Sequence, residues 1–437
     1  MTGKLTAALL LSTLLASPVT GQDENRVRSR DAGIITGTLE PGELNMITDV
    51  AGVKAGHVTL VEGDNIRTGV TAIIPHSGNL FADKVPAAIH CFNGFGKLAG
   101  YLQVRELGNI ETPIVLTNTL NVGTAVDAVV RYMLNLEGNE NVRSVNAVVG
   151  ETNDGFLNDI RGQHVKAAHI EEAVKGARGG PVEEGSVGAG TGTTSMGFKA
   201  GIGTASRKTP SIGGKSYTVG VLVQSNFGRE LVINGVTVPR DAVSAGTAAT
   251  AGGPEAGTGR SLPGNKHFAD GAVDPVVTTG NAPATDTAAT TGDPATTAGD
   301  PAITADKEDD GSCMIIIATD APISSRNLER LARRSFNGMA RTTRFMSNSS
   351  GDFAIAFSTA YRISHGGPDL SADMPPLLDN SAMDGLFRAV EEATQEAVYN
   401  SLFMAEGMEG RDGNRAGAVS VARVLELLEG HNMIKTE

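Results

Sequence analysis

The sequence predicts a mixed α/β protein, and three observations lead to this prediction. Short β-branched runs that end at glycine turns alternate with segments in which apolar residues recur every three or four positions. Of the 437 residues 55 are glycine, none is tryptophan and only 4% are aromatic, so closely packed backbones are expected. One long stretch, residues 242–310, consists largely of Ala, Thr, Gly, Pro and Asp and cannot bury a core.

Before that stretch, the pattern indicates both strands and helices. Alternating β-branched runs predict strands at residues 69–74 and 217–223. Apolar residues at helical spacing predict helices at residues 122–136 and 162–175. We interpret residues 242–310 as a flexible insertion, since it is too long for an ordinary ordered loop.

After the insertion, order is expected to resume abruptly at Gly311. The run 314–318 is typical of a buried strand, and residues 325–339 of a helix with Ser324 or Ser325 as its N-cap. A further strand is expected where Phe353, Ile355 and Phe357 alternate with small residues. Helical patterns return at residues 383–404 and 416–428.

The first 21 residues are typical of a cleaved secretory signal. Lys4 precedes an apolar run, residues 5–19, that is too short to cross a bilayer comfortably, and small residues follow before Gln22. This segment could otherwise be a mitochondrial transit peptide or a buried helix, and the absence of arginine before Arg26 counts against the transit peptide. We therefore expect a secreted protein, periplasmic if its source is bacterial, with no membrane span.

Composition and missing motifs exclude several classes of function. A net charge of −13 and a pI near 5.2 argue against nucleic acid and anionic membranes as partners. The chain has no G-x-S-x-G elbow, no H-E-x-x-H and no other ligand cluster, so neither a metal nor a cofactor is expected. The two cysteines, Cys91 and Cys313, form no disulfide framework. The glycine-rich segment 185–203 has Phe198 where a phosphate-binding loop needs lysine, so tight backbone packing explains it better.

The pair Gly311-Ser312 stands at the edge between the insertion and the predicted strand 314–318. Attack of the Ser312 hydroxyl on the Gly311 carbonyl, followed by hydrolysis, would leave Ser312 with a hydroxyl and a free α-amine. Free α-amines titrate at about 7.7–8.0, so one residue would carry both nucleophile and base. A plain turn is the simpler reading of a Gly-Ser pair taken alone.

Several blocks together resemble one family. The junction GSCMIIIATDAP, residues 311–322, resembles the self-cleavage site of the L-aminopeptidase/D-amidase-esterase and beta-peptidyl aminopeptidase family. Further blocks look like those of the family and follow in its order: NMITDVAGVKAG (45–56), RTGVTAIIP (67–75), GETNDGFLND (150–159), residues 185–207 and GDFAIAFSTA (351–360). The likeness covers residues 26–437 apart from the insertion, which is longer than the usual connection of the family.

The resemblance implies a role for five residues. Ser312 matches the nucleophile, and Asn226 the position that stabilises the oxyanion; otherwise Asn226 is a strand-end residue that starts a turn. Ser350 and Asp352 match a Ser-x-acid pair that orients the nucleophile, although the family commonly has Glu where this chain has Asp. Glu151 matches the acid that meets the free amino group of the substrate; taken alone, it would be a solvated strand-end residue.

The resemblance also implies the overall architecture and activity. The expected fold is a four-layer αββα sandwich of N-terminal-nucleophile type, self-cleaved between Gly311 and Ser312 into residues 22–311 and 312–437. The expected activity is release of N-terminal residues from short peptides, amino-acid amides or esters through an acyl-enzyme at Ser312, without a cofactor, by a homo-oligomer of cleaved protomers. Two alternatives stay open: an acyltransferase similar to the ornithine acetyltransferase group, which has threonine at the junction, and an uncleaved binding or scaffold protein.

Overall fold

The computed structural model describes residues 26–243, 311–366 and 374–434, and within them two β-sheets pack face to face. The four-stranded sheet has the order β1-β2-β5-β6, and the seven-stranded sheet has the order β15-β3-β14-β13-β10-β9, with β4 paired to β3. The strands of the first sheet are β1 (Lys54–Glu62), β2 (Ile66–Ile74), β5 (Ile114–Asn118) and β6 (Val148–Thr152). Those of the second are β3 (Asp83–Gly94), β4 (Asn109–Ile110), β9 (Ile202–Lys208), β10 (Thr218–Asn226), β13 (Ser312–Thr319), β14 (Gly351–Ser358) and β15 (Ile363–Ser364).

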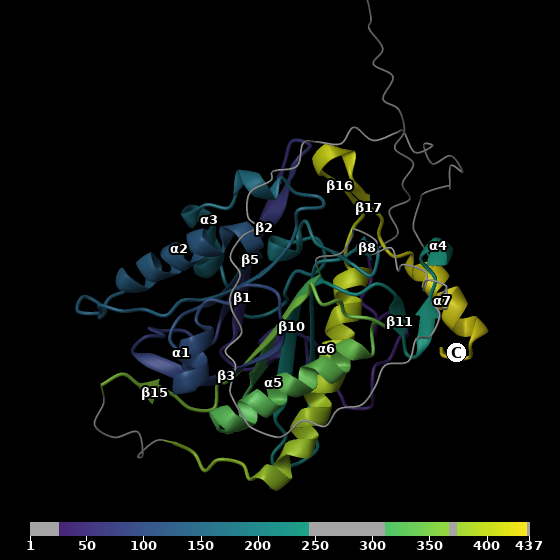
Figure 1. Ribbon diagram of the computed structural model, residues 1–437. Helices are drawn as coiled ribbons and strands as arrows, with labels where there is room; N and C mark the ends of the chain where they lie inside the picture. Colours follow the sequence, from purple (N-terminus) through teal and green to yellow (C-terminus); the bar gives the residue numbers. More distant parts are fainter. Residues whose placement is uncertain (1–25, 244–310, 367–373, 435–437) are drawn as a thin grey trace, which may run out of the picture. The chain divides into compact units, whose positions relative to one another are not determined.

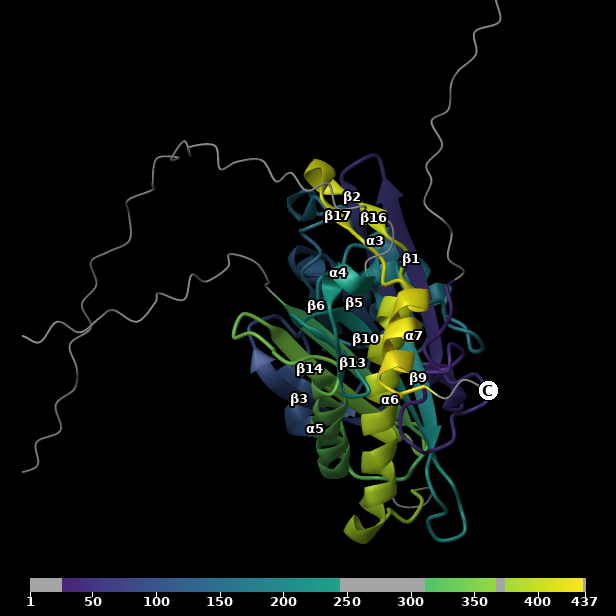
Figure 2. The same cartoon turned by 90° about the vertical axis from the view of Figure 1, so that its right-hand side faces the viewer.

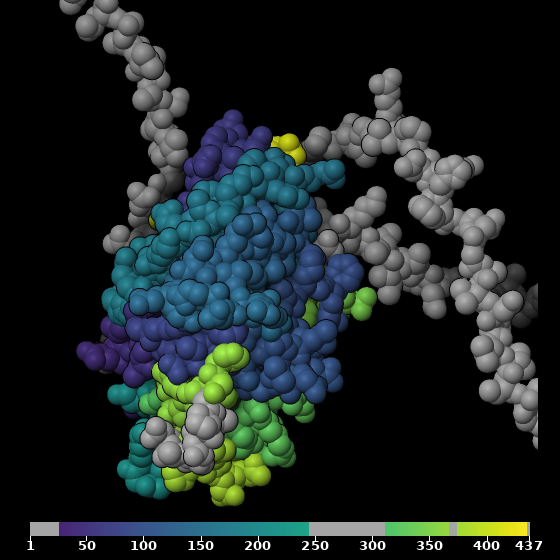
Figure 3. All heavy atoms as spheres, turned by 90° about the vertical axis from the view of Figure 1, so that its left-hand side faces the viewer, coloured from purple at the N-terminus to yellow at the C-terminus, as the bar shows by residue number. Residues whose placement is uncertain are grey.

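A helical layer covers the outer face of each sheet (Figures 1 and 2). Helices α2 (Val122–Leu134) and α3 (Ala167–Lys175) pack on the four-stranded sheet, and in Figure 3 this layer, in blue and teal, forms much of the visible surface. Helices α5 (Ser325–Ala340) and α6 (Met383–Phe403) pack on the seven-stranded sheet. The predicted four-layer αββα sandwich is therefore confirmed.

The remaining helices and paired strands are not part of the two main sheets. They are helices α1 (Tyr101–Leu107), α4 (Arg240–Val243) and α7 (Val421–Gly430) and the two-stranded sheets β7 (Thr194–Ser195) with β8 (Phe198–Lys199), β11 (Leu231–Ile233) with β12 (Val236–Val238), and β16 (Met408–Glu409) with β17 (Arg415–Ala416). None of the helices within the described ranges is long and apolar enough to cross a membrane.

The central strand β13 is buried along its whole length and distributes its side chains between two core layers. Met314 and Ile316 pack between the two sheets, whereas Cys313, Ile315 and Ile317 pack under the helices. This alternation is the period-two pattern of a strand whose two faces are both buried. It fixes which side of the sheet each residue of the 311–322 block faces.

Two predicted helix starts were wrong. Helix α3 begins at Ala167 instead of residue 162, because Gln163 has a positive φ of 47° that ends a separate single turn, Ile160–Gly162. Helix α7 begins after the N-cap Ser420 instead of at Ala416, which belongs to β17. In α5 the N-cap is Ser324, whose hydroxyl accepts the Asn327 N–H.

The predicted insertion begins two residues too early, since Val243 is buried and its carbonyl accepts the Ser420 N–H at 2.8 Å. The rest of that prediction, and the predicted signal at residues 1–21, lie outside the described residues.

A buried ion cluster fixes the first described segment against α6. The Arg207 guanidinium, fully buried on β9, pairs with the Glu396 carboxylate, which also accepts hydrogen bonds from Arg30 at 3.1–3.2 Å and from the Asn45 side chain. Burial alone would raise the pKa of Glu396, but the positive charges of Arg207 and Arg30 hold it below its usual range. The carboxylate is thus ionised and ties β9 and residues 30–45 to one helix.

We predict that Glu396→Ala lowers the free energy of unfolding by about 3–5 kcal/mol, because it leaves the buried Arg207 without its main partner. The urea unfolding midpoint measures the effect. Glu171→Ala, which breaks the exposed pair of Glu171 with Lys175, is the control and should leave the midpoint unchanged. Equal midpoints for both variants would show that the cluster contributes no stability.

Candidate active site

The strand register brings three remote segments together at one edge of the seven-stranded sheet. Ser312, the first residue of β13, lies opposite Asn226, the last residue of the antiparallel β10. On its other side it lies opposite Gly351, the first residue of the parallel β14. The predicted nucleophile and the predicted oxyanion residue are therefore direct neighbours.

The Ser312 side chain lies on the face of β13 that packs between the two sheets, together with Met314 and Ile316. Its hydroxyl oxygen accepts a hydrogen bond from the Asn153 N–H at 3.4 Å, and the side chain is buried. Asn153 directly follows β6, so the second sheet also contributes to the site. Its contribution is a backbone N–H, which sequence reasoning could not single out.

The junction itself is held by backbone contacts. The Gly311 carbonyl oxygen accepts a hydrogen bond from the Gly351 N–H at 3.1 Å. This donor polarises the carbonyl that Ser312 would attack, as in an oxyanion hole. A Cβ on Gly311 would lie 3.3 Å from the Ser350 hydroxyl oxygen, a tight contact that would require Ser350 to shift by a few tenths of an ångström.

Asn226 is buried with its amide oriented. Its Oδ1 accepts a hydrogen bond from the Thr194 N–H at 3.1 Å, which fixes the orientation of the side-chain amide. Thr194 belongs to the glycine-rich segment 185–203, in which a Cβ on Gly201 would collide with the Gly185 carbonyl. The prediction of tight backbone packing for this segment is confirmed, and the packing also serves to hold Asn226.

The Ser350–Asp352 pair forms despite the shorter acid. The Ser350 hydroxyl donates to Asp352 Oδ1 at 2.8 Å, and both side chains are buried. The pair lies beside Gly311 and Cys313, and no hydrogen bond links it to the Ser312 hydroxyl in the uncleaved chain. Burial raises the pKa of Asp352 to about 6, against the opposing effect of hydrogen bonds from Ser350 and the Cys313 backbone.

Glu151 lies in β6, two residues before Asn153, and is only 5% exposed. Its Oε1 accepts hydrogen bonds from the Lys97 N–H at 2.9 Å and from Lys97 Nζ at 3.3 Å. A Cβ on Gly96 would lie 3.2 Å from this oxygen and 3.3 Å from Gly351 Cα, so Glu151 adjoins the start of β14. Its cation partner, Lys97, was not foreseen, because nothing in the sequence relates residue 97 to residue 151.

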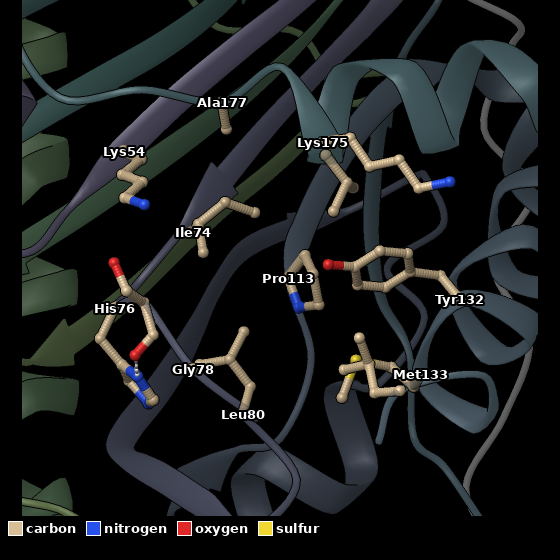
Figure 4. A pocket seen from close by; sticks show the side chains of 13 residues that line it. Lys54, Ile74, His76, Gly78, Leu80, Pro113, Tyr132, Met133, Lys175 and Ala177 are labelled. Atoms are coloured by element: carbon tan, nitrogen blue, oxygen red, sulfur yellow. Dashed lines mark hydrogen bonds between the residues drawn. The ribbon is translucent and has the colours of Figure 1, made fainter. Parts of the chain in front are cut away.

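A cavity of about 340 Å³ lies elsewhere, where β1 begins and β2 ends (Figure 4). Its lining includes Lys54, His76, Tyr132 and Lys175 and none of the predicted site residues. Strands β5 and β6 are parallel neighbours. Pro113 of the cavity lining lies just before the start of β5, whereas Glu151 and Asn153 lie at the end of β6, which is the opposite end of this strand pair. The cavity is thus separate from the Ser312 site.

Comparison with known proteins agrees with this geometry. The model of peptidase family S58 matches residues 45–416. The chain belongs to this family. It is 36% identical to the beta-peptidyl aminopeptidase BapA of Sphingosinicella microcystinivorans, over 93% of this chain and 92% of the relative, and also 36% identical to BapA of Sphingosinicella xenopeptidilytica, over 97% and 95%.

Solved structures of similar proteins share the fold. The Burkholderia sp. beta-aminopeptidase is 34% identical with a TM-score of 0.72, covering 92% of this chain and 99% of that one. The L-aminopeptidase D-Ala-esterase/amidase of Ochrobactrum anthropi, described as a variant of the Ntn hydrolase fold, is 31% identical with a TM-score of 0.73, covering 93% and 99%. The predicted family and fold type are confirmed, and the protein is a serine hydrolase with aminopeptidase or amidase activity.

We predict that ionisation of Asp352, whose pKa burial raises above that of an ordinary aspartate, produces one acidic limb of kcat, because the carboxylate accepts the Ser350 hydrogen bond more strongly than the neutral acid does. The Ser350 hydroxyl donates to the Asp352 carboxylate and thereby stabilises its ionised form. Ser350→Ala should therefore raise the pKa of Asp352 and move this limb of the residual activity to higher pH. Asp352→Asn should abolish this limb. A pH–rate profile of kcat checks both variants, and a limb that keeps its position in both would assign it to another group.

Proposed function

We propose that the protein cleaves its own chain between Gly311 and Ser312 and then uses Ser312 as the N-terminal nucleophile of an aminopeptidase. The position of Ser312 between Asn226 and Gly351 is the observation that carries this proposal. Residues 22–311 and 312–437 would form the two chains, once residues 1–21 have been removed as a secretory signal.

In the first reaction, the Ser312 hydroxyl attacks the Gly311 carbonyl carbon and transfers its proton to the nitrogen that leaves. The Gly351 N–H stabilises the oxygen as negative charge develops on it. The C–N bond breaks as an ester bond forms, which frees the Ser312 α-amine, and water then hydrolyses the ester to a Gly311 carboxylate and the Ser312 hydroxyl. Ser350 lies beside Gly311, whose position becomes vacant after cleavage. The Ser350–Asp352 pair is therefore positioned to accept a hydrogen bond from the new Ser312 α-amine.

In each later turnover, the Ser312 hydroxyl attacks the carbonyl carbon of the substrate, and the α-amine accepts its proton. An α-amine suits this task because it titrates at about 7.7–8.0. The Asn226 amide group donates to the tetrahedral oxygen, the leaving amine or alcohol takes up the proton, and water hydrolyses the acyl-enzyme at Ser312.

The substrates that we propose are short peptides, amides or esters with a free amino terminus. Glu151 supports this class, since a carboxylate that is only 5% exposed favours a ligand with a positive charge. The names of the relatives support the same class and extend it to β-amino-acid residues at the N-terminus. Homo-oligomers of cleaved protomers, secreted from the cell, complete the proposal.

We predict that Ser312→Ala remains one chain on a denaturing gel and hydrolyses no substrate, because the variant lacks the attacking oxygen. The wild type should separate into two bands. Two bands from Ser312→Ala would contradict self-cleavage by this residue.

We predict that Asn226→Ala still cleaves itself at least in part but loses about 10²–10³ in kcat, the usual cost of removing one oxyanion donor. Steady-state kinetics of the two-chain fraction measure the loss. Asn337→Ala, a change on the exposed face of α5, is the control and should keep the wild-type kcat. A wild-type kcat in Asn226→Ala would give Asn226 a structural role.

A further inference from the structure

The carboxylate of Glu151 has a cation partner that differs sharply from it in exposure. Glu151 exposes 5% of its side chain, whereas Lys97 exposes 54% of its own. Lys97 approaches Glu151 with two groups, its backbone N–H and its ammonium, and both reach the same oxygen, Oε1. Within the described ranges, Oε2 accepts no hydrogen bond.

The two contacts of Lys97 are independent of each other. The backbone contact is fixed, because Ala99 pairs with Val149 of β6 in both directions, at 3.0 and 3.3 Å, and Gly96 packs against Gly351. The ammonium is held only by the ion pair, and its half-exposed side chain can turn into solvent at little cost. The Lys97 ammonium can therefore leave Glu151 while the backbone stays in place.

We propose that Lys97 is a displaceable counter-ion, which neutralises Glu151 in the free enzyme and gives up its place to the amino terminus of the substrate. This inference rests on the proposed role of Glu151 as the amino-group site. A nearly buried carboxylate without a cation is unfavourable, and Lys97 supplies that cation while the site is empty. Two ammonium groups on one carboxylate would repel each other, so Lys97 competes with the substrate.

The competition makes Lys97 a determinant of substrate affinity. Its removal should strengthen the binding of substrates that carry an amino terminus and of no others. The size of the effect follows from the value of a partly exposed ion pair, which corresponds to about a two- to fivefold change in KM.

The test compares Lys97→Met with the wild type on an aminoacyl ester and on its deamino analogue. We expect KM for the aminoacyl ester to fall about two- to fivefold with kcat nearly unchanged, and KM for the analogue to stay constant. Lys97→Arg, which keeps the cation, should have the wild-type KM. Lys175→Met, which breaks an exposed ion pair elsewhere, controls for the loss of one positive charge. An unchanged or raised KM for the aminoacyl ester, or an equal fall for the analogue, would overturn the inference.

Glu151→Gln separates this inference from the role on which it rests. If Glu151→Gln raises KM for the aminoacyl ester but not for the analogue, while Lys97→Met changes neither, Glu151 binds the amino group and the counter-ion inference alone fails. If Glu151→Gln does not distinguish the two esters, the role of Glu151 fails as well. Thermal unfolding of each variant shows whether the fold is retained.

Discussion

The register of β13 between β10 and β14 brings Asn226, Ser312 and Gly351 side by side at one edge of the central sheet. A slip by one residue would turn Ser312 toward the helices and Cys313 toward the second sheet, because side chains alternate along a strand. The buried residues Met314, Ile316, Ile315 and Ile317 oppose such a slip from both faces. Met314 also reaches the second sheet, where a Cβ on Gly150 would lie 2.5 Å from its methyl group. The packing that sets the register thus also places the end of β6 and Asn153 next to Ser312.

The proposed mechanism requires the site to act first on the uncleaved chain and then on a substrate. In the described chain, the Gly351 N–H donates to the Gly311 carbonyl, and the Ser350 hydroxyl oxygen lies 3.3 Å from where a Cβ on Gly311 would be. The Asn226 side chain is oriented by the Thr194 N–H, and the Glu151 carboxylate by the Lys97 N–H. In the proposed mechanism, the backbone donor of Gly351 acts in self-cleavage and the side-chain donor of Asn226 acts in turnover. Glycine at position 311 leaves Ser350 in place, whereas a Cβ there would make a tight 3.3 Å contact with its hydroxyl oxygen.

Local sequence patterns predicted four of the described strands, β2, β10, β13 and β14, whereas the four layers and the candidate site residues were predicted from the resemblance of several blocks to the family. Apolar runs revealed β13 and β14, and the 311–322 block pointed to the junction. Backbone donors escaped prediction, since the N–H groups of Asn153, Thr194 and Gly351 have no counterpart in residue type. Lys97 escaped it because its partner Glu151 is distant in sequence. Helix starts at residues 162 and 416 were misplaced where a positive φ and a short strand interrupt a helical pattern.

The most direct test of this account is rapid-quench mass spectrometry of the purified enzyme during hydrolysis of an aminoacyl ester. The account predicts that the acyl group is found on a peptide whose first residue is Ser312, which shows a free chain end and the nucleophile in one measurement. An active enzyme with an intact bond between Gly311 and Ser312, or an acyl group on any other residue, would contradict it.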